Sequence, residues 1–184
     1  ADPRLRCAWD WALFAGGFVP ALVFGVAFGN LLQGAPFAFD TDMRVTYHGS
    51  FFALLNPFAL LTGCVSLSML VAHGAAFVKM KTDGVIAARA CLALRAATTV
   101  ALLTFALAGA LVATTIMGFR IESAPPLDAV ANPLLKTVEA GKGLGLANYE
   151  RFPWRSVAPA LGFVGGIVAF AVERSRVEKT AFIA

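Results

Sequence analysis

Four long segments of the chain carry no charged residue, and they constrain the fold more than any other feature. They run over Trp11–Leu32, Phe51–Val78, Ala96–Phe119 and Ser156–Val172. A helix needs about 20 residues to cross a hydrocarbon core about 30 Å thick; the first three segments reach that length and the fourth comes close. Their apolar residues are continuous rather than alternating, which excludes the strands of a membrane barrel.

These segments predict an all-α, polytopic membrane protein, a single transmembrane domain over 1–184. We place its four helices at about 11–33, 51–78, 96–119 and 155–173, the second tilted or broken, and an extramembrane loop at 120–153. Composition agrees, because 59% of residues are hydrophobic and only 14% are charged, against about 25% charged in soluble domains. So few polar residues cannot cover a soluble surface, and so much apolar surface does not stay disordered.

The distribution of the 15 Lys and Arg residues predicts the orientation. Nine lie in the two tails and the second connection, and six in the first and third connections; the nine are Arg4, Arg6, Lys79, Lys81, Arg89, Arg95, Arg174, Arg176 and Lys179. Basic residues near helix ends favour the cytoplasm, so we place both ends of the chain there. They form no stripe, and we expect no nucleic-acid partner despite the net charge of +4.

The third connection, 120–153, is the only sizeable polar segment. We interpret it as a solvated loop, with a lid or subunit contact as the alternative, and expect a short helix around Leu134–Ala140. At its end Arg151, Trp154 and Arg155 are typical of an anchor at the membrane interface.

Prolines and small residues in the apolar segments predict tight helix packing. The prolines are Pro20, Pro57 and Pro159, and each removes a backbone hydrogen bond whose carbonyl must find another partner. The small-residue pairs at four-residue spacing are Gly25 with Gly29, Gly162 with Gly166, and Ala106 with Ala110. Such pairs let helix backbones approach closely in a membrane.

The polar residues inside the apolar segments are the candidates for chemistry, because burying them in a membrane is costly. They are Asn30, Gln33, Asn56 and His73, and for each we favour a packing role over a ligand contact. Only His48 and His73 could offer imidazole to a haem, and we place them near opposite faces of the membrane. Met69 shares a helix face with His73, whereas two axial ligands must approach iron from opposite sides.

The remaining motifs name no reaction. Cys7, Cys64 and Cys91 match no redox, haem-attachment or zinc spacing and are interpreted as packing residues. Nucleotide-binding and nucleophilic hydrolase motifs are absent from the sequence. We therefore predict no catalytic residue and no metal site in this chain.

Two stretches of sequence are specific enough to suggest a family. FGNLLQG spans 28–34 and LLNPFALL spans 54–61, and both hold rare polar residues at fixed places. With FALAG at 105–109 and PALG at 159–162, they make the chain resemble subunit II of the bacterial cytochrome bd-type quinol oxidases, including the cyanide-insensitive branch. The resemblance covers nearly the whole chain but only the interior of a longer family member, so we expect the chain to be an excerpt of such a subunit.

The resemblance implies a multi-pass subunit of the bacterial inner membrane, paired with a larger subunit I and in some cases a small accessory subunit. The complex oxidises quinol, reduces oxygen to water and generates a proton-motive force. Its b-type haems and haem d are held by subunit I, so this chain is expected to bind no haem firmly. Subunit II is implied to be an eight-helix scaffold that can hold a structural quinone, which Asn30, Gln33, Asn56 or His73 could contact.

Two alternatives stay open at this point. Breaks at Pro20 and Pro57 would suit half of a membrane transporter with a site at the bilayer midplane. The chain could also be a purely structural assembly subunit with no share in turnover.

Overall fold

Four long helices make up most of the chain. The computed structural model describes residues 5–126, 128–130 and 135–181. The long helices are α1 (Arg6–Gln33), α2 (Pro57–Lys81), α3 (Gly84–Thr114) and α5 (Val157–Ala181). Within the described residues, four stretches are long and apolar enough to cross a membrane: they lie in α1, α2 and α3 and, for the fourth, over Pro153–Ala171, which ends in α5. The predicted all-α, polytopic membrane fold is confirmed.

Shorter elements occupy the first and third connections. The first holds the strands β1 (Phe37–Phe39) and β2 (Val45–Tyr47) and the 3-10 helix η2 (Phe52–Leu55). The third holds β3 (Met117–Ser123), β4 (Thr137–Lys142), η4 (Leu144–Leu146), α4 (Ala147–Arg151) and η5 (Pro153–Ser156). Each strand pair is an antiparallel hairpin, with Phe37 opposite Tyr47 in one and Met117 opposite Lys142 in the other.

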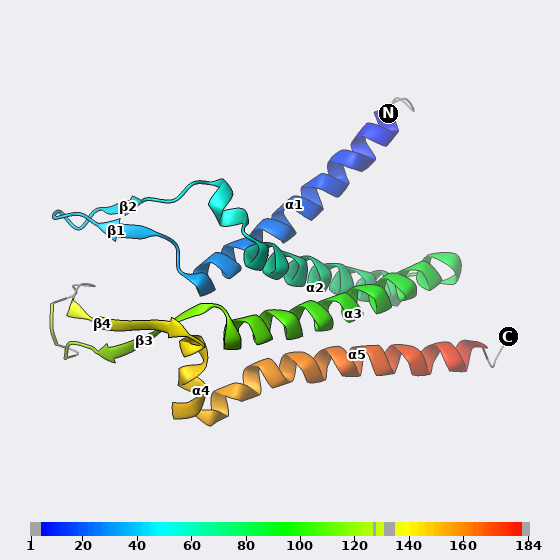
Figure 1. The fold of residues 1–184 in the computed structure, drawn as a ribbon. Coiled ribbons are helices and arrows are strands. Elements are labelled where there is room, and N and C mark those ends of the chain that lie inside the picture. The colour runs from blue at the N-terminus through cyan, green and yellow to red at the C-terminus, as the bar shows by residue number, and fades with distance from the viewer. Residues whose placement is uncertain (1–4, 127, 131–134, 182–184) are drawn as a thin grey trace.

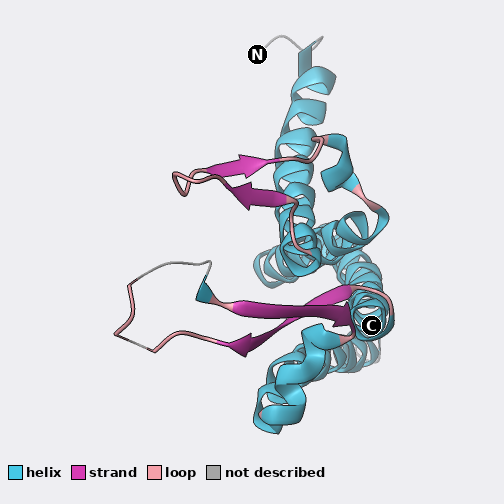
Figure 2. Cartoon of the chain, turned by 60° about the vertical axis from the view of Figure 1, so that its left-hand side comes forward, coloured by secondary structure: helices cyan, strands magenta, loops and turns pink. Residues whose placement is uncertain are grey.

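The helices are arranged so that both hairpins project from one end of the bundle (Figures 1 and 2). The α2–α3 turn and the two ends of the chain lie toward the other end (Figure 1). In the same view α3 lies between α2 and α5, and α1 crosses α2 on its far side. This matches the alternation of sides predicted from the charges. That the hairpin end faces away from the cytoplasm stays a prediction.

Helix α2 begins at Pro57, later than the predicted start at 51, because local chemistry fixes its first turn. Asn56 has an extended backbone (φ −67°, ψ 161°) and its side chain accepts a hydrogen bond from the Ala59 amide at 2.9 Å. Pro57 stands at the first helical position, where the missing N–H would have no helical acceptor. The predicted span 51–78 is therefore broken at Asn56, between η2 and α2, whereas α2 itself is continuous from Pro57 to Lys81. Pro159 lies in the first turn of α5, where its missing N–H likewise removes no helical hydrogen bond.

Helix α3 begins at Gly84, not at 96, and ends at Thr114, not at 119. Its 31 residues measure about 45 Å, longer than a hydrocarbon core. Charge marks where a helix leaves the bilayer, not where it ends, so Arg89 and Arg95 lie inside α3. The β-branched run from Thr114 to Ile116 then gives way to strand β3. Helix α1 likewise begins earlier than predicted, at Arg6.

The third connection contains a β-hairpin where a short helix was predicted around Leu134–Ala140. Leu134 itself lies outside the described residues, but Thr137–Lys142 is strand β4, so that prediction is wrong. Thr137 and Val138 favour an extended backbone. Arg120 on β3 stands opposite Glu139 on β4 and forms an ion pair with it. This cross-strand pair of opposite charges favours the observed register.

Close helix packing is confirmed at Gly25 and Gly29. A Cβ built on Gly25 would lie 2.7 Å from Gly63 Cα, and one on Gly29 would lie 2.7 Å from Ala59 Cα. The backbones of α1 and α2 therefore touch at positions where only glycine fits. Ala106 and Ala110 behave differently, because both are exposed.

Pro20 marks a change along α1. The helix continues through it, but its buried residues, Ala21, Gly25, Val26 and Gly29, all follow the proline. The half of α1 before Pro20 diverges from α2 (Figure 1) and exposes large apolar side chains such as Trp11 and Phe14.

Candidate functional site

We call the end of the bundle that carries the two hairpins the outer end, and the end with the α2–α3 turn the inner end. Two of the predicted polar residues, Asn30 on α1 and Asn56 before α2, meet at the outer end. Asn56 Nδ2 donates to Asn30 Oδ1 at 3.3 Å and to the Ala53 carbonyl at 3.4 Å. Asn30 Nδ2 donates to the carbonyls of Val26 at 2.8 Å and Leu54 at 2.7 Å. The pair thereby joins α1, η2 and the start of α2.

The hydrogen bonds of this pair leave little capacity for a ligand. A side-chain amide carries two donor hydrogens and one acceptor oxygen. Both donors of Asn30 and both donors of Asn56 are used, and each amide oxygen accepts one bond. The geometry suits a structural clamp between helices, in which the polar groups satisfy one another within the membrane protein.

Gln33 lies one turn beyond Asn30, as the last residue of α1, and it is half-buried. Gly34 follows with φ +81°, a left-handed conformation that glycine adopts without strain. A Cβ on Gly34 would lie 2.9 Å from the ring of Phe119 on β3, so the end of α1 contacts the base of the second hairpin. Gln33 therefore lies close to the clamp.

His73 is remote from the other three candidates. Sixteen residues separate Pro57 from His73 along α2, a distance of about 24 Å. His73 lines a cleft of about 430 Å³ between α2, α3 and α5. The cleft is lined by Met69, Ala72, His73, Ala76, Leu94, Thr98, Ala101, Leu102, Phe105, Gly162, Gly166 and Ala169. The four candidates thus fall into two places, not one site.

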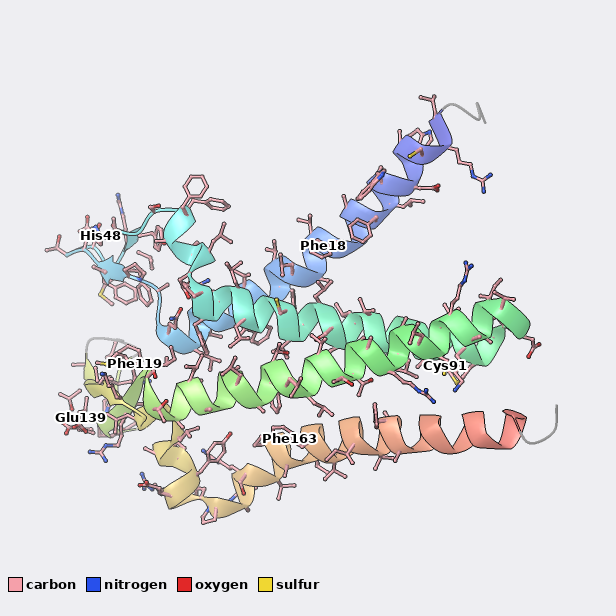
Figure 3. The ribbon with its side chains drawn as sticks, turned by 45° about the vertical axis from the view of Figure 1, so that its right-hand side comes forward. Phe18, His48, Cys91, Phe119, Glu139 and Phe163 are labelled. Atoms are coloured by element: carbon pink, nitrogen blue, oxygen red, sulfur yellow. The ribbon has the colours of Figure 1, made fainter. Side chains whose placement is uncertain are left out.

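Neither His48 with His73 nor Met69 with His73 can ligate the two sides of one haem iron. His48 lies in the first connection, among the outer hairpins (Figure 3). His73 lies about 24 Å along α2 from the outer end of that helix. Met69 is one turn from His73 on the same face, so these two cannot coordinate opposite sides of one iron. Among the described residues, no three His, Cys, Asp or Glu side chains gather as metal ligands.

A second cleft, absent from the sequence-based predictions, lies at the outer end between β3, η4 and α4. Its volume is about 720 Å³, and its charged lining comes from Arg120, Glu122, Glu150 and Arg151. The sequence carried no signal for it because the cleft forms only when the hairpin folds beside α4. Nearby, the guanidinium carbon of Arg155 lies 4.5 Å from the centroid of the Phe152 ring and 5.6 Å from that of Trp154. These contacts bring together basic and aromatic residues of the segment that was predicted to anchor the chain at the membrane interface.

Comparison with known proteins decides the family. The family model described as cytochrome bd terminal oxidase subunit II matches residues 1–184. The chain belongs to this family. The resemblance predicted from the FGNLLQG and LLNPFALL stretches is confirmed.

Individual relatives agree with the family match. The chain is 46% identical over 174 residues to the probable cytochrome oxidase subunit 2 of Haemophilus influenzae, which covers 95% of this chain and 46% of that protein. It is 42% identical over 181 residues to the cytochrome bd-I ubiquinol oxidase subunit 2 of Escherichia coli K12, covering 98% of this chain and 47% of the relative. The chain thus spans about half the length of these curated relatives.

The family match and the apolar helices together give the location. The chain is a multi-pass protein of the bacterial inner membrane. Neither alternative function is supported by the comparisons. The transporter interpretation also loses its structural basis, because α2 is unbroken from Pro57 to Lys81 and α1 continues through Pro20.

Proposed function

We propose that this chain forms a four-helix half of subunit II of a cytochrome bd-type terminal oxidase. Such a complex is a quinol:oxygen oxidoreductase, which oxidises quinol, reduces oxygen to water and supports aerobic respiration. The observation that carries the proposal is the family match along all 184 residues, together with 42% identity to a ubiquinol oxidase subunit over 98% of the chain.

Within that complex we assign this chain a scaffolding role and no catalytic residue. The b-type haems and haem d belong, in this proposal, to the partner subunit I. The separation of His48 from His73 supports the assignment, as does the use of Asn30 and Asn56 in hydrogen bonds between helices. When bound to subunit I, the haems supply the electron transfer and oxygen chemistry.

The partner is expected on the outward-facing small residues of α3. Ala106, Gly109 and Ala110 are exposed, and a Cβ built on Gly109 meets nothing within 4 Å. Small residues in a membrane helix allow close approach of a second helix. We therefore expect subunit I, or further helices of subunit II, to pack against this face.

A structural quinone remains part of the proposal, with Asn30, Gln33, Asn56 and His73 as its candidate contacts. Gln33 is the strongest of these, because it is half-buried beside the clamp and its amide has no structural role of the kind seen for Asn30 and Asn56. For Asn30 and Asn56 we favour packing.

The test is a reduced-minus-oxidised visible spectrum of the material that co-purifies with the tagged full-length subunit from its native membranes. We expect the bands of haem b and the far-red band of haem d, carried by a larger partner. The same purification from an untagged strain is the control. A preparation that keeps its native partners but contains no haem would refute the assignment.

A further inference from the structure

The cleft beside His73 has the character of a binding site for a long apolar molecule. Its volume of about 430 Å³ lies within the usual range of ligand pockets. Ten of its twelve lining residues are apolar or glycine, and the polar exceptions are His73 and Thr98. Three helices contribute to it, so the cleft depends on the assembled bundle rather than on one helix surface.

Phe105 on α3 and Gly162 on α5 are the lining residues nearest the outer end of the bundle. There the rings of Phe105 on α3 and Phe163 on α5 lie 5.1 Å apart between centroids, and Phe163 lies on the α5 segment that runs alongside α3 (Figure 3). A Cβ on Gly166 would lie 2.6 Å from Leu102, so α5 contacts α3 closely here too. His73, one of the two polar lining residues, lies in the inner half of the cleft.

Arg95 supplies positive charge at that inner end. It precedes the lining residues Thr98 and Leu102 by three and seven positions, which puts it on the same face of α3, one turn closer to the inner end. Arg95 is half-buried. From Arg95 to Thr114 the helix rises about 28 Å, close to the thickness of a hydrocarbon core. Arg95 therefore lies where acyl chains meet headgroups.

His73 lies at a similar depth. It is eight residues before the end of α2, and Arg95 is eleven residues after the start of α3. These separations correspond to about 12 Å and about 16 Å from the inner ends of the two helices. His73, in the lining of the cleft, and Arg95, on the cleft-facing side of α3, thus lie at a similar level of the bundle.

We propose that this cleft binds an anionic phospholipid of the phosphatidylglycerol type. One acyl chain lies between α2, α3 and α5 and ends below Phe105. The phosphate pairs with Arg95, and His73 donates a hydrogen bond to a glycerol ester carbonyl. Basic pockets between transmembrane helices recognise anionic headgroups in this way, because the cation and the apolar slot select different parts of one molecule. The proposal does not depend on the assignment of oxidase activity.

The test uses the full-length subunit in the assembly that purifies from native membranes. Retained lipid is counted by native mass spectrometry, and binding is then measured by adding phosphatidylglycerol or phosphatidylethanolamine to the delipidated protein. Arg95→Gln is compared with Arg89→Gln, which makes the same charge change on the opposite face of α3 from Thr98. Ala72→Leu narrows the cleft without changing any charge.

We expect the unsubstituted protein to prefer phosphatidylglycerol. Loss of the charged contact in Arg95→Gln should weaken its binding about tenfold, whereas Arg89→Gln should change binding by less than about twofold. Ala72→Leu should lower retention of the lipid. Equal losses in Arg89→Gln and Arg95→Gln, or no preference for the anionic lipid, would overturn the proposal. So would a quinone retained in place of the lipid. If Arg95→Gln does not assemble, unchanged lipid retention in Ala72→Leu would overturn it alone.

Discussion

The α1–α2 crossing gives the sharpest prediction, since a single methyl group distinguishes a tolerated helix position from a forbidden one. We consider Gly25→Ala. The new Cβ would lie 2.7 Å from Gly63 Cα and 2.7 Å from Ser66 Cβ, and it would also collide with the Thr62 carbonyl oxygen. The nearest obstacles are backbone atoms, so no side-chain rotation relieves the contact. The two helices must separate.

The size of the effect follows from that separation. Carbon atoms in ordinary contact lie about 3.5–4.0 Å apart, so the helices must move by about 1 Å, which forfeits up to half of the dispersion energy along the crossing. Overpacking of this kind costs about 1–3 kcal/mol. Gly17→Ala on the same helix is the matched control, because its Cβ meets nothing within 4 Å. Both substitutions gain the same helix propensity, so the difference between them isolates the packing cost.

The assay is the thermal unfolding midpoint of the full-length subunit in its native assembly, in detergent, for the two variants and the unsubstituted protein. We expect Gly25→Ala to lower the midpoint, and Gly17→Ala to leave it unchanged or raise it slightly. Gly29→Ala should resemble Gly25→Ala, because its Cβ would lie 2.7 Å from Ala59 Cα. Equal midpoints for Gly25→Ala and Gly17→Ala would show that the helices do not cross as described.

The remaining predictions concern the clamp, the outer hairpin and the orientation. Asn56→Ala removes the cap of α2 and should destabilise the assembled complex by about 1 kcal/mol without changing quinol oxidation; a raised quinol requirement would instead indicate a direct role. Gln33→Ala separates the same outcomes, and as the stronger quinone candidate it is the variant expected to raise that requirement. Arg120→Gln breaks an exposed ion pair, so its effect on stability should stay below about 1 kcal/mol, and a larger loss would show that the hairpin is buried against a partner. In a cysteine-free background, Thr41→Cys should react with a membrane-impermeant maleimide from outside the inner membrane and Thr82→Cys only from the cytoplasm; the reverse pattern would invert the topology.

Hydropathy predicted the existence of the four helices well. It predicted poorly the residues at which they begin and end, because local chemistry sets those positions. Continuous apolar segments identify four spans, because the bilayer demands length and uniform apolarity. They do not reveal that Asn56 and Pro57 together start α2, which postpones its first residue. Nor do they reveal the extension of α3 to Gly84, since that part of the helix lies outside the hydrocarbon and its composition is unconstrained by it. The hairpins were missed because strands of three to seven residues are too short to show much periodicity.

The candidate residues were found because burying a polar side chain in a membrane is costly. The structure then distinguishes them by the groups that each one contacts. Asn30 and Asn56 stood out because amides are rare in apolar segments, yet their pairing across 26 positions is a property of the α1–α2 crossing. His73 stood out for the same reason, but the cleft beside it arises only when α5 packs against α3. Arg95 was counted for orientation alone, because sequence cannot tell which side of a helix faces a neighbour.

The connection between α2 and α3 consists of Thr82 and Asp83 alone, whereas the connections at the other end contain whole hairpins. In the predicted orientation, the α2–α3 unit can enter the bilayer as a helical hairpin whose charged tip, with Lys79, Lys81 and Asp83, stays on the cytoplasmic side. The longer connections are the ones that must be translocated, and their strands then pair on the far side. In that orientation a cytoplasmic protease would find only two non-helical residues, Thr82 and Asp83, between the ends of α2 and α3.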